Sequence, residues 1–346
     1  MSSYDMIVMK KMIHEKQLPW VEKYRPNNID HIISHKEIIQ SLVNFIDAES
    51  LPHLLFFGPS GSGKTSTIKC CAKKMYDTYI NYMVLELNAS NERGIETVRT
   101  KIKNFVNNKI STYLPKKNMK NVFKLVILDE IDSMTVEAQG MLRQTIEKNS
   151  KTARFCLICN DIDKINVALQ SRCAMFRFAP LSAKDMLVRL KEICTIEQMS
   201  YNKNSLDAII KITKGDMRAA INLLQHVNQT VSEKITVEHI YNISGHCLPK
   251  VNEEIYDKLI RLSKKKIDMI TCVDEISELI IQNDMTIFNL LEELKNIILE
   301  GNLSTNKKLY LIDNLAKNEI YDSVNIESKI IIMIIISMFI MVDEIK

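Results

Sequence analysis

The sequence has no apolar run long enough to cross a membrane. Its longest run, Ile330–Val342, falls short of the roughly 18–20 residues that a membrane-spanning helix needs, and Lys329 and Asp343 flank it. We therefore predict a buried helix in a helical C-terminal domain or at a subunit interface. The N-terminal stretch Met1–Lys10 lacks the apolar core of a secretory signal, so we expect a nuclear or cytosolic protein without membrane association.

The sequence also lacks a large excess of one charge, internal repeats and long low-complexity tracts. Its formal net charge of +4 and isoelectric point near 8.5 stay below the value of about 9 that marks a dedicated nucleic-acid-binding domain. Contacts with nucleic acid would therefore depend on locally placed basic residues. The 346 residues, of which 46% are hydrophobic, are enough for two or three globular domains of about 100–200 residues each.

The eight cysteines are scattered and predict neither disulfides nor a metal site. One C-x-x-C pair, Cys156 and Cys159, lies within an apolar run that we interpret as a buried strand. Because residues i and i+3 of a strand point to opposite faces, these two thiols should not chelate one metal or form a redox pair.

Short β-type runs alternate with stretches of helical length. The runs span residues 54–57, 83–88, 124–130, 154–159 and 174–178. This alternation predicts an α/β domain with a parallel sheet and helices on both faces. After Pro180 only helical spacing continues, with a break at Gly245–Pro249. We therefore predict three domains, namely an α/β domain at 1–180, a small helical domain at 181–247 and an all-α domain at 248–346.

A glycine-rich loop follows the first predicted strand and opens a helix. The segment GPSGSGKTS fits G-x-x-x-x-G-K-[ST] in the context that a phosphate-binding loop requires. Backbone N–H groups and the helix N-terminus would hold the phosphates, Lys64 would neutralise the β- and γ-phosphates, and Thr65 could ligate Mg²⁺. The predicted nucleotide contacts are Gly58, Pro59, Ser60, Gly61, Ser62, Gly63, Lys64, Thr65 and Ser66. A nucleotide site that has lost its activity is the alternative.

Hydrolysis needs an acidic pair, and LDEID provides one at the end of an apolar strand. Asp129 could hold Mg²⁺ through its water shell, and Glu130 could polarise the attacking water. Asn160 ends the run RFCLICN and could position the water or the γ-phosphate. The alternative, a solvated acidic turn, is less favoured because apolar residues precede the pair and the phosphate loop lies upstream.

Taken together, the motifs resemble one known family. WVEKYRP (20–26), the phosphate loop, ELNASNERGI (86–95), LDEIDSM, RFCLICN, SRC and GDMRAAINLLQ (215–225) occur in the order and spacing of a small subunit of replication factor C, the eukaryotic loader of sliding DNA clamps. The resemblance covers about residues 18–245. Among small subunits the chain looks most like the fourth human one. The resemblance implies an AAA+ module, a helical lid and a helical collar through which unlike subunits form a heteropentamer.

The resemblance also implies roles for individual residues. In the family, Asn160 would be the first sensor, Arg218 the second sensor on the lid, and Asn88 a polar partner that restrains Glu130 until DNA binds. Arg172 of the SRC motif would reach the ATP of a neighbouring subunit as an arginine finger, although an ion pair within its own subunit is the alternative. The residues expected to line the adenine pocket are Val21, Tyr24, Arg25 and Pro26.

The partners implied by the resemblance are nuclear. They are the other replication factor C subunits, the sliding clamp (proliferating cell nuclear antigen) and primer–template DNA, with ATP and Mg²⁺ as cofactors. DNA phosphates would be contacted without base readout. The predicted DNA contacts are Arg93, Arg99, Lys103 and Lys164.

Two alternatives stay open on the sequence alone. The first is a structural subunit that binds ATP with little turnover, against which Lys64, Glu130 and Arg172 together argue. The second is another AAA+ remodeller, which would need a central pore loop that the sequence does not show. Departures from the family pattern remove no catalytic atom; for example, Ser60 stands where proline is frequent and Asn91 where aspartate is common.

Overall fold

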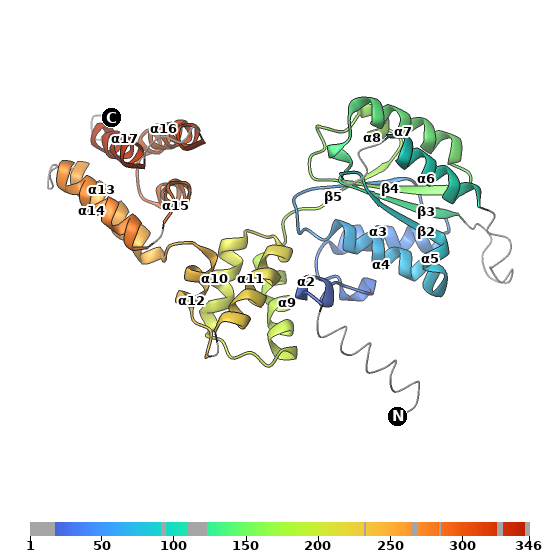
Figure 1. Ribbon diagram of the computed structural model, residues 1–346, viewed down its shortest axis with the longest axis horizontal. Coiled ribbons are helices and arrows are strands. Elements are labelled where there is room, and N and C mark those ends of the chain that lie inside the picture. Colours follow the sequence, from blue (N-terminus) through green and yellow to red (C-terminus); the bar gives the residue numbers. More distant parts are fainter. Residues whose placement is uncertain are drawn as a thin grey trace. The chain divides into compact units, whose positions relative to one another are not determined.

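The computed structural model describes residues 18–90, 95–108, 123–231, 233–263, 269–283, 285–323 and 328–342. The chain forms two compact units, Met1–Gln229 and Thr230–Lys346 (Figure 1). The three predicted domains, at 1–180, 181–247 and 248–346, stay a prediction.

The first unit is built on a five-stranded sheet in which all paired neighbours are parallel, as the alternating sequence pattern predicts. Its strands are β1 (Leu54–Phe57), β2 (Val84–Asn88), β3 (Lys124–Asp129), β4 (Ala153–Cys159) and β5 (Ala174–Arg177). The order across the sheet is β2-β3-β4-β1-β5, so β1 lies between β4 and β5. The carboxyl ends of all five strands therefore meet at one edge, where ligands of open α/β sheets bind.

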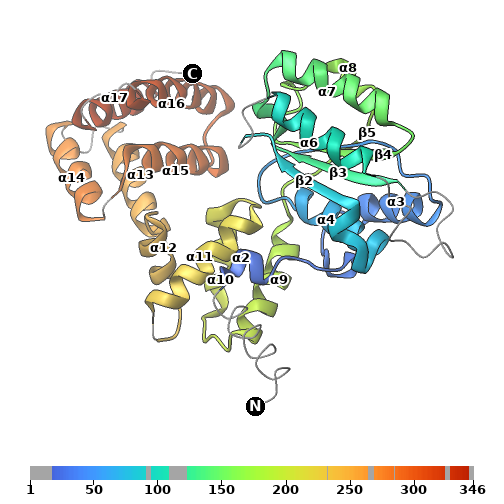
Figure 2. The same cartoon turned by 45° about the vertical axis from the view of Figure 1, so that its right-hand side comes forward.

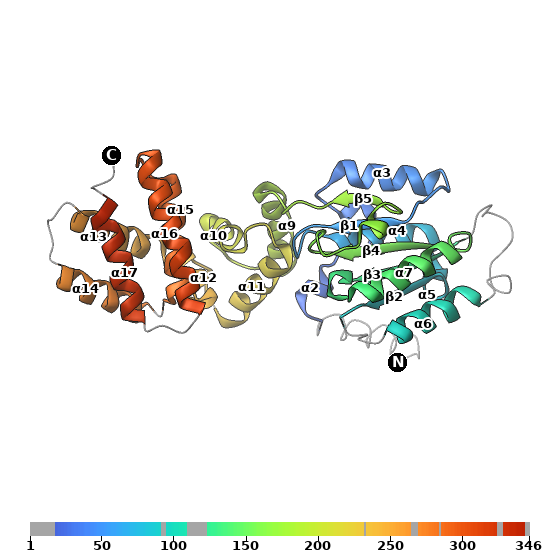
Figure 3. The ribbon, with the colours of Figure 1, turned by 90° about the horizontal axis from the view of Figure 1, so that it is seen from above.

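Helices cover both faces of this sheet (Figures 1 and 3). The helices on one face are α3 (Lys36–Asp47), α4 (Lys64–Tyr76) and α5 (Ile80–Met83), and those on the other are α6 (Ile95–Asn107), α7 (Val136–Asn149) and α8 (Val167–Gln170). Each face has its own apolar core, and the inner strands β1, β3 and β4 contribute apolar side chains to both cores because both of their sides are buried. Cys156 belongs to one core and Cys159 to the other, which confirms that they cannot pair. All eight cysteines are free.

The N-terminal segment of the described chain is tied to helices far along the sequence. The N-terminal segment contains α2 (Trp20–Lys23). The distant helices are those of the lid, α9 (Ala183–Ile196), α10 (Lys203–Thr213) and α11 (Met217–Thr230). The Trp20 N–H donates to Gln225 Oε1 at 2.9 Å, and Arg189 donates to the Tyr24 carbonyl oxygen at 2.7 Å. Lys23 and Tyr24 both donate to the Glu197 carboxylate at the end of α9. Short 3-10 helices lie at Ile29–His31, Asp77–Tyr79 and Ile131–Ser133.

The second unit is helical in its described part. Its helices are α12 (Val237–Ser244), α13 (Pro249–Ser263), α14 (Met269–Gln282), α15 (Ile287–Glu300), α16 (Thr305–Ser323) and α17 (Ser328–Met341). Gly245, with a φ of +69°, ends α12 at the predicted break. Helix α17 packs beside α16 (Figure 2), and Ile331, Ile336 and Phe339 are fully buried, which confirms the predicted buried helix. Among the described helices, none is long and apolar enough to span a membrane.

His53, in the first unit, should make the stability of the protein fall as the pH is lowered. His53 Nδ1 accepts a hydrogen bond from the Phe155 N–H at 3.2 Å, which requires the neutral ring. Burial, and secondly the charge of Arg154, lower the pKa of His53 to about 4. Since an unfolded histidine has a pKa of about 6.5, the unfolded state gains a proton first as pH falls, and stability is lost between about pH 6.5 and 4. We expect His53 to contribute about 2 kcal/mol to this loss, allowing for partial exposure.

The check is denaturant unfolding at pH 7, 6 and 5 for the native chain and for His53→Asn, whose amide oxygen can replace the acceptor without titrating. The variant should lose less stability over this range. An equal loss in both proteins would contradict the role of His53.

Candidate functional site

A cavity of about 460 Å³ opens at the carboxyl ends of the strands, between the phosphate loop, the N-terminal segment and the lid helices of the first unit. It collects most of the residues that the sequence predicted for nucleotide binding. Those that line it are Val21, Tyr24, Arg25, Pro26, Ser60, Gly61, Ser62, Gly63, Lys64, Thr65, Ser66, Asp129, Glu130, Asn160 and Arg218. Gly58 and Pro59 do not line it, but their carbonyl oxygens hold Lys64.

The phosphate loop adopts a backbone that two of its glycines make possible. Gly58 has a φ of +142°, and a Cβ there would lie 2.0 Å from the carbonyl oxygen of Phe178. Gly61 has a φ of +63°, and a Cβ there would lie 1.8 Å from Asp216 Oδ1 of the lid. Side chains at either position would push apart the loop and its surroundings. Helix α4 begins at Lys64, so its N-terminus points its free N–H groups at the loop.

Lys64 is buried and bound to three protein oxygens. Its Nζ donates to the carbonyl oxygens of Gly58 and Pro59, both at 2.8 Å, and to Asn160 Oδ1 at 3.0 Å. Burial lowers the pKa of this ammonium, and the Asp129 carboxylate opposes that effect. Lys64 and Asn160, predicted separately from two motifs, therefore form one hydrogen-bonded pair beside the phosphate loop.

The end of strand β4 is held by an acid that the sequence reading did not assign. Asp132 Oδ2 accepts hydrogen bonds from the N–H groups of Asn160 at 3.0 Å and Asp161 at 3.3 Å. This carboxylate fixes the backbone from which the Asn160 side chain reaches Lys64. In the sequence, the only indication of this role is that Asp132 is the second aspartate of the LDEID motif.

The predicted metal ligands are also in contact. Thr65 Oγ1 donates to Asp129 Oδ2 at 2.8 Å. A hydroxyl beside a carboxylate suits Mg²⁺, which is usually held by one or two protein oxygens together with phosphates and water. No cluster of three or more His, Cys, Asp or Glu side chains able to hold a metal occurs among the described residues. The protein part of such a site would therefore consist of Thr65 and Asp129.

Glu130 lines the cavity in a left-handed conformation. Its φ is +57°, which is uncommon for a residue with a side chain and is often found at functional sites. Its N–H donates to Asp129 Oδ1 at 2.9 Å, so Asp129 orients the residue that follows it. Asn88 also lines the cavity, but its Oδ1 accepts from the N–H and hydroxyl of Ser90. Its predicted restraint on Glu130 stays a prediction.

The lid contributes Arg218 and contacts the phosphate loop directly. Asp216 accepts from the Ala219 N–H at 3.0 Å, at the start of α11, and from the Ser60 hydroxyl at 2.7 Å. A proline at position 60 could not make the second bond, because it has no hydroxyl. Sequence reasoning missed several lid and N-terminal residues of the cavity, which are His31, Ile32, Ile33, Ser34, Asp185, Arg189 and Met217. Of these residues, only Asp185 and Arg189 have a recognisable sequence pattern, because their i, i+4 spacing places them on the same face of one helix.

The remaining predicted residues lie away from the cavity or outside the described chain. Arg172 does not line the cavity and forms an ion pair with Glu147 of its own chain, with Nε at 2.7 Å from Oε1. Lys103 is exposed on α6, and Lys164 is exposed and lies 3.7 Å from Asp161. Arg93 and the side chain of Arg99 lie outside the described residues.

Comparisons with known proteins agree with this geometry. The sequence model of the ATPase family associated with various cellular activities (AAA) matches residues 54–181. The fold is similar to a solved Thermotoga maritima RuvB, described as a Holliday junction branch migration motor, with a TM-score of 0.50 and 15% identity over 79% of this chain and 91% of that chain. At this identity the likeness concerns the fold alone.

Sequence relatives are much more similar. A replication factor C small subunit of Acanthamoeba polyphaga mimivirus is 61% identical over 99% of this chain and 100% of its own length. Human replication factor C subunit 5 is 39% identical over 94% of this chain and 92% of its own, and Schizosaccharomyces pombe subunit 3 is 40% identical over 88% and 85%. The numbers in these names differ, so they assign no subunit number, and the resemblance to the fourth human subunit stays a prediction. The identity over nearly the whole chain shows that this protein belongs to the family of replication factor C small subunits, which are AAA ATPases.

Proposed function

We propose that this chain binds ATP and Mg²⁺ in the cavity of its first unit and hydrolyses ATP as a working subunit of a clamp loader. Clamp loading is the role of its family. The observation that carries the proposal is the convergence of the phosphate loop, the acidic pair and both predicted sensors on one cavity. A subunit that only held ATP would not need Glu130 at that cavity.

The mechanism follows from the contacts around the phosphate loop. Lys64 would exchange its bonds to the loop carbonyls for phosphate oxygens, and Thr65 and Asp129 would hold the metal. Bound Mg²⁺ would neutralise phosphate charge. Glu130 would accept a proton from the attacking water, while Asn160, already hydrogen-bonded to Lys64, would orient that water or the γ-phosphate. Arg218 would bring the lid to the phosphates.

The partners follow from the family. A replication factor C small subunit works in an assembly with other subunits of that kind, and we propose a heteropentamer that opens proliferating cell nuclear antigen and places it at primer–template junctions. A nuclear location fits the eukaryotic relatives. Arg172 would serve the ATP of a neighbouring subunit, since it does not line the cavity of its own chain.

We propose DNA-phosphate contacts through Arg93, Arg99, Lys103 and Lys164. Exposure of Lys103 and Lys164 is compatible with this role. Lys124 supports the helix that carries Lys103: its buried ammonium donates to the carbonyl oxygens of Phe105 and Asn108 at the C-terminal end of α6. Cations at this end also complement the helix dipole.

Lys64→Ala tests the proposal. In the complex formed with the other replication factor C subunits from the same source, and with their ATP sites disabled, we expect ATP affinity to fall about 10- to 100-fold, because a charged donor to the phosphates is lost. ATP-dependent clamp loading should fall with it. Lys73→Ala, an exposed lysine on the same helix, is the matched control.

Unchanged ATP affinity in Lys64→Ala would remove this site from the mechanism. Native mass measurement of the complex separates the remaining alternative, because a remodelling AAA+ ring would contain six subunits and a clamp loader five.

A further inference from the structure

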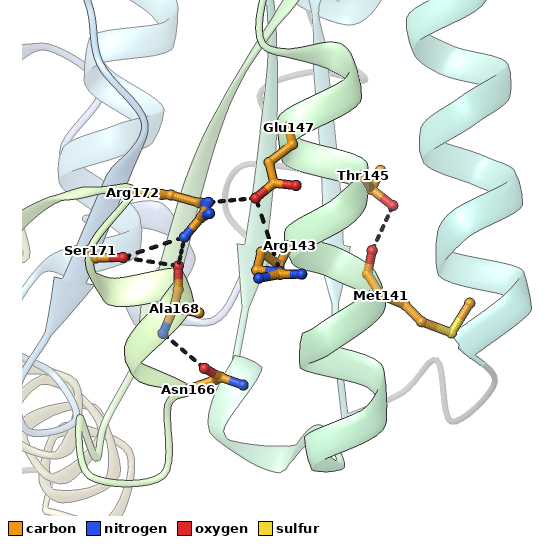
Figure 4. Close-up of polar contacts among 8 residues, drawn as sticks. All are labelled: Met141, Arg143, Thr145, Glu147, Asn166, Ala168, Ser171 and Arg172. Atoms are coloured by element: carbon orange, nitrogen blue, oxygen red, sulfur yellow. Dashed lines mark hydrogen bonds and ion pairs between the residues drawn. The ribbon is translucent and has the colours of Figure 1, made fainter.

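Arg172 is held by a glutamate that no sequence motif singled out. Glu147 lies near the end of helix α7, and Arg172 lies on the turn between α8 and β5 (Figure 4). Arg172 Nε donates to Glu147 Oε1 at 2.7 Å. Its Nη1 donates to the Ala168 carbonyl oxygen at 2.7 Å and lies 3.4 Å from the Ser171 hydroxyl. The Glu147 carboxylate on α7 and the Ala168 carbonyl oxygen on α8 therefore accept hydrogen bonds from the same guanidinium.

These two contacts determine the direction of the guanidinium. The group is planar, so fixing Nε and Nη1 fixes the whole plane. The second terminal nitrogen, Nη2, has no hydrogen-bond partner among the described residues. The side chain as a whole is 37% exposed. Arg172 is thus oriented by its own chain while retaining donors for a further acceptor.

The elements that hold Arg172 are themselves well anchored. Asn166 Oδ1 accepts from the Ala168 N–H at 2.8 Å and caps α8, as Figure 4 shows. Leu169 on the same short helix is fully buried in the core on that face of the sheet, and Ile146, the neighbour of Glu147 on α7, is buried in it too. The Ala168 carbonyl and the Glu147 backbone therefore share one rigid support.

The ion pair between Glu147 and Arg172 is too exposed to contribute much to the stability of the fold. The side chains of Glu147 and Arg172 are 42% and 37% exposed, and exposed pairs contribute little to folding because water screens them. Arg143, one turn before Glu147, brings a second guanidinium to the same oxygen, with Nε at 4.0 Å. Glu147 Oε1 thus lies between two guanidinium groups, of which only that of Arg172 is within hydrogen-bond distance.

We propose that Glu147 is a positioning residue for the arginine finger, which holds Arg172 with its free edge directed at the γ-phosphate of a neighbouring subunit's ATP. This inference rests on the proposed role of Arg172 in trans. An unrestrained arginine samples many rotamers, so orienting it before assembly lowers the entropy cost of engaging the phosphate. Glu147 would act through Arg172 without touching nucleotide.

The test uses pentamers in which only the subunit that receives Arg172 can hydrolyse ATP. Glu147→Ala in this chain should lower kcat at that adjoining site about 10- to 100-fold, as expected for a misplaced catalytic group, with little change in KM for ATP. Glu147→Gln keeps an acceptor oxygen and should recover most of the loss. Glu137→Ala, the same change at an exposed position on the same helix, is the control.

The double variant with Arg172→Ala distinguishes positioning from a general structural effect. If Glu147 acts only through Arg172, the double variant should be no slower than Arg172→Ala alone. A further loss of turnover in the double variant would overturn the inference about Glu147. Normal or faster turnover in Glu147→Ala, while Arg172→Ala is slow, would overturn it too. In both cases the role of Arg172 as an arginine finger would stand. Faster turnover would mean that Glu147 withholds Arg172 from the phosphate. Normal turnover in Arg172→Ala would overturn both.

Discussion

Arg172→Ala should lower ATP hydrolysis at the adjoining subunit by about 10³–10⁵-fold, the range for a complete arginine finger. Nucleotide affinity at the Lys64 site of the same chain should hardly change, because Arg172 does not line that cavity. The physical reason is charge: a permanently protonated guanidinium stabilises the γ-phosphoryl oxygens as negative charge redistributes in the transition state. Coupling between subunits would then follow, since a shift of one subunit withdraws the cation from its neighbour's ATP.

The measurement places Arg172→Ala in pentamers that contain one competent ATP site. In one assembly the variant and the competent site share a chain, and in the other they lie on adjacent chains. Arg177→Ala, an exposed arginine on β5, controls for loss of surface charge. Turnover that falls only when the variant and the site share a chain would identify Arg172 as an internal structural residue, with the Glu147 ion pair as its main contact.

Glu130→Gln should slow hydrolysis at this chain's own site by about 10²–10⁴-fold, the usual contribution of a general base, while ATP binding and clamp opening persist. Glutamine has the same shape and can retain both the left-handed backbone at this position and the hydrogen bond from its N–H to Asp129. Clamp and loader should therefore remain together on DNA for longer. The loss would appear in kcat and kcat/KM alike.

Single-turnover cleavage in a complex with only this site active measures the effect of Glu130→Gln. A matched control is Glu49→Gln, because Glu49 is an exposed glutamate that also has a positive φ, of 52°. Normal cleavage in Glu130→Gln would show that another group activates the water. Cleavage that is already absent in the native chain would instead support the structural subunit that binds ATP without turnover.

The sequence alone determined the sheet and the strand-end motifs. Each apolar run is short and bounded, and β1 begins and ends where the run at 54–57 does. The opposite orientation of Cys156 and Cys159 also follows from strand geometry alone. The phosphate loop and LDEID could be found because their chemistry needs fixed residue types at fixed spacing. Parallel strands then bring their carboxyl ends to one edge, so Lys64 and Asn160 were predictable neighbours.

Only the tertiary structure decided which side chains from distant segments hold the functional groups. Glu197 receives hydrogen bonds from Lys23 and Tyr24 across more than 170 residues, and Asp216 reaches Ser60 across 156. The bond between Arg172 and Glu147 joins the turn after α8 to helix α7 and has no sequence signature. Local periodicity shows which face of an element is buried, whereas these pairings depend on how the lid and the helices pack on the sheet. A single charged residue fits many partners until that packing selects one.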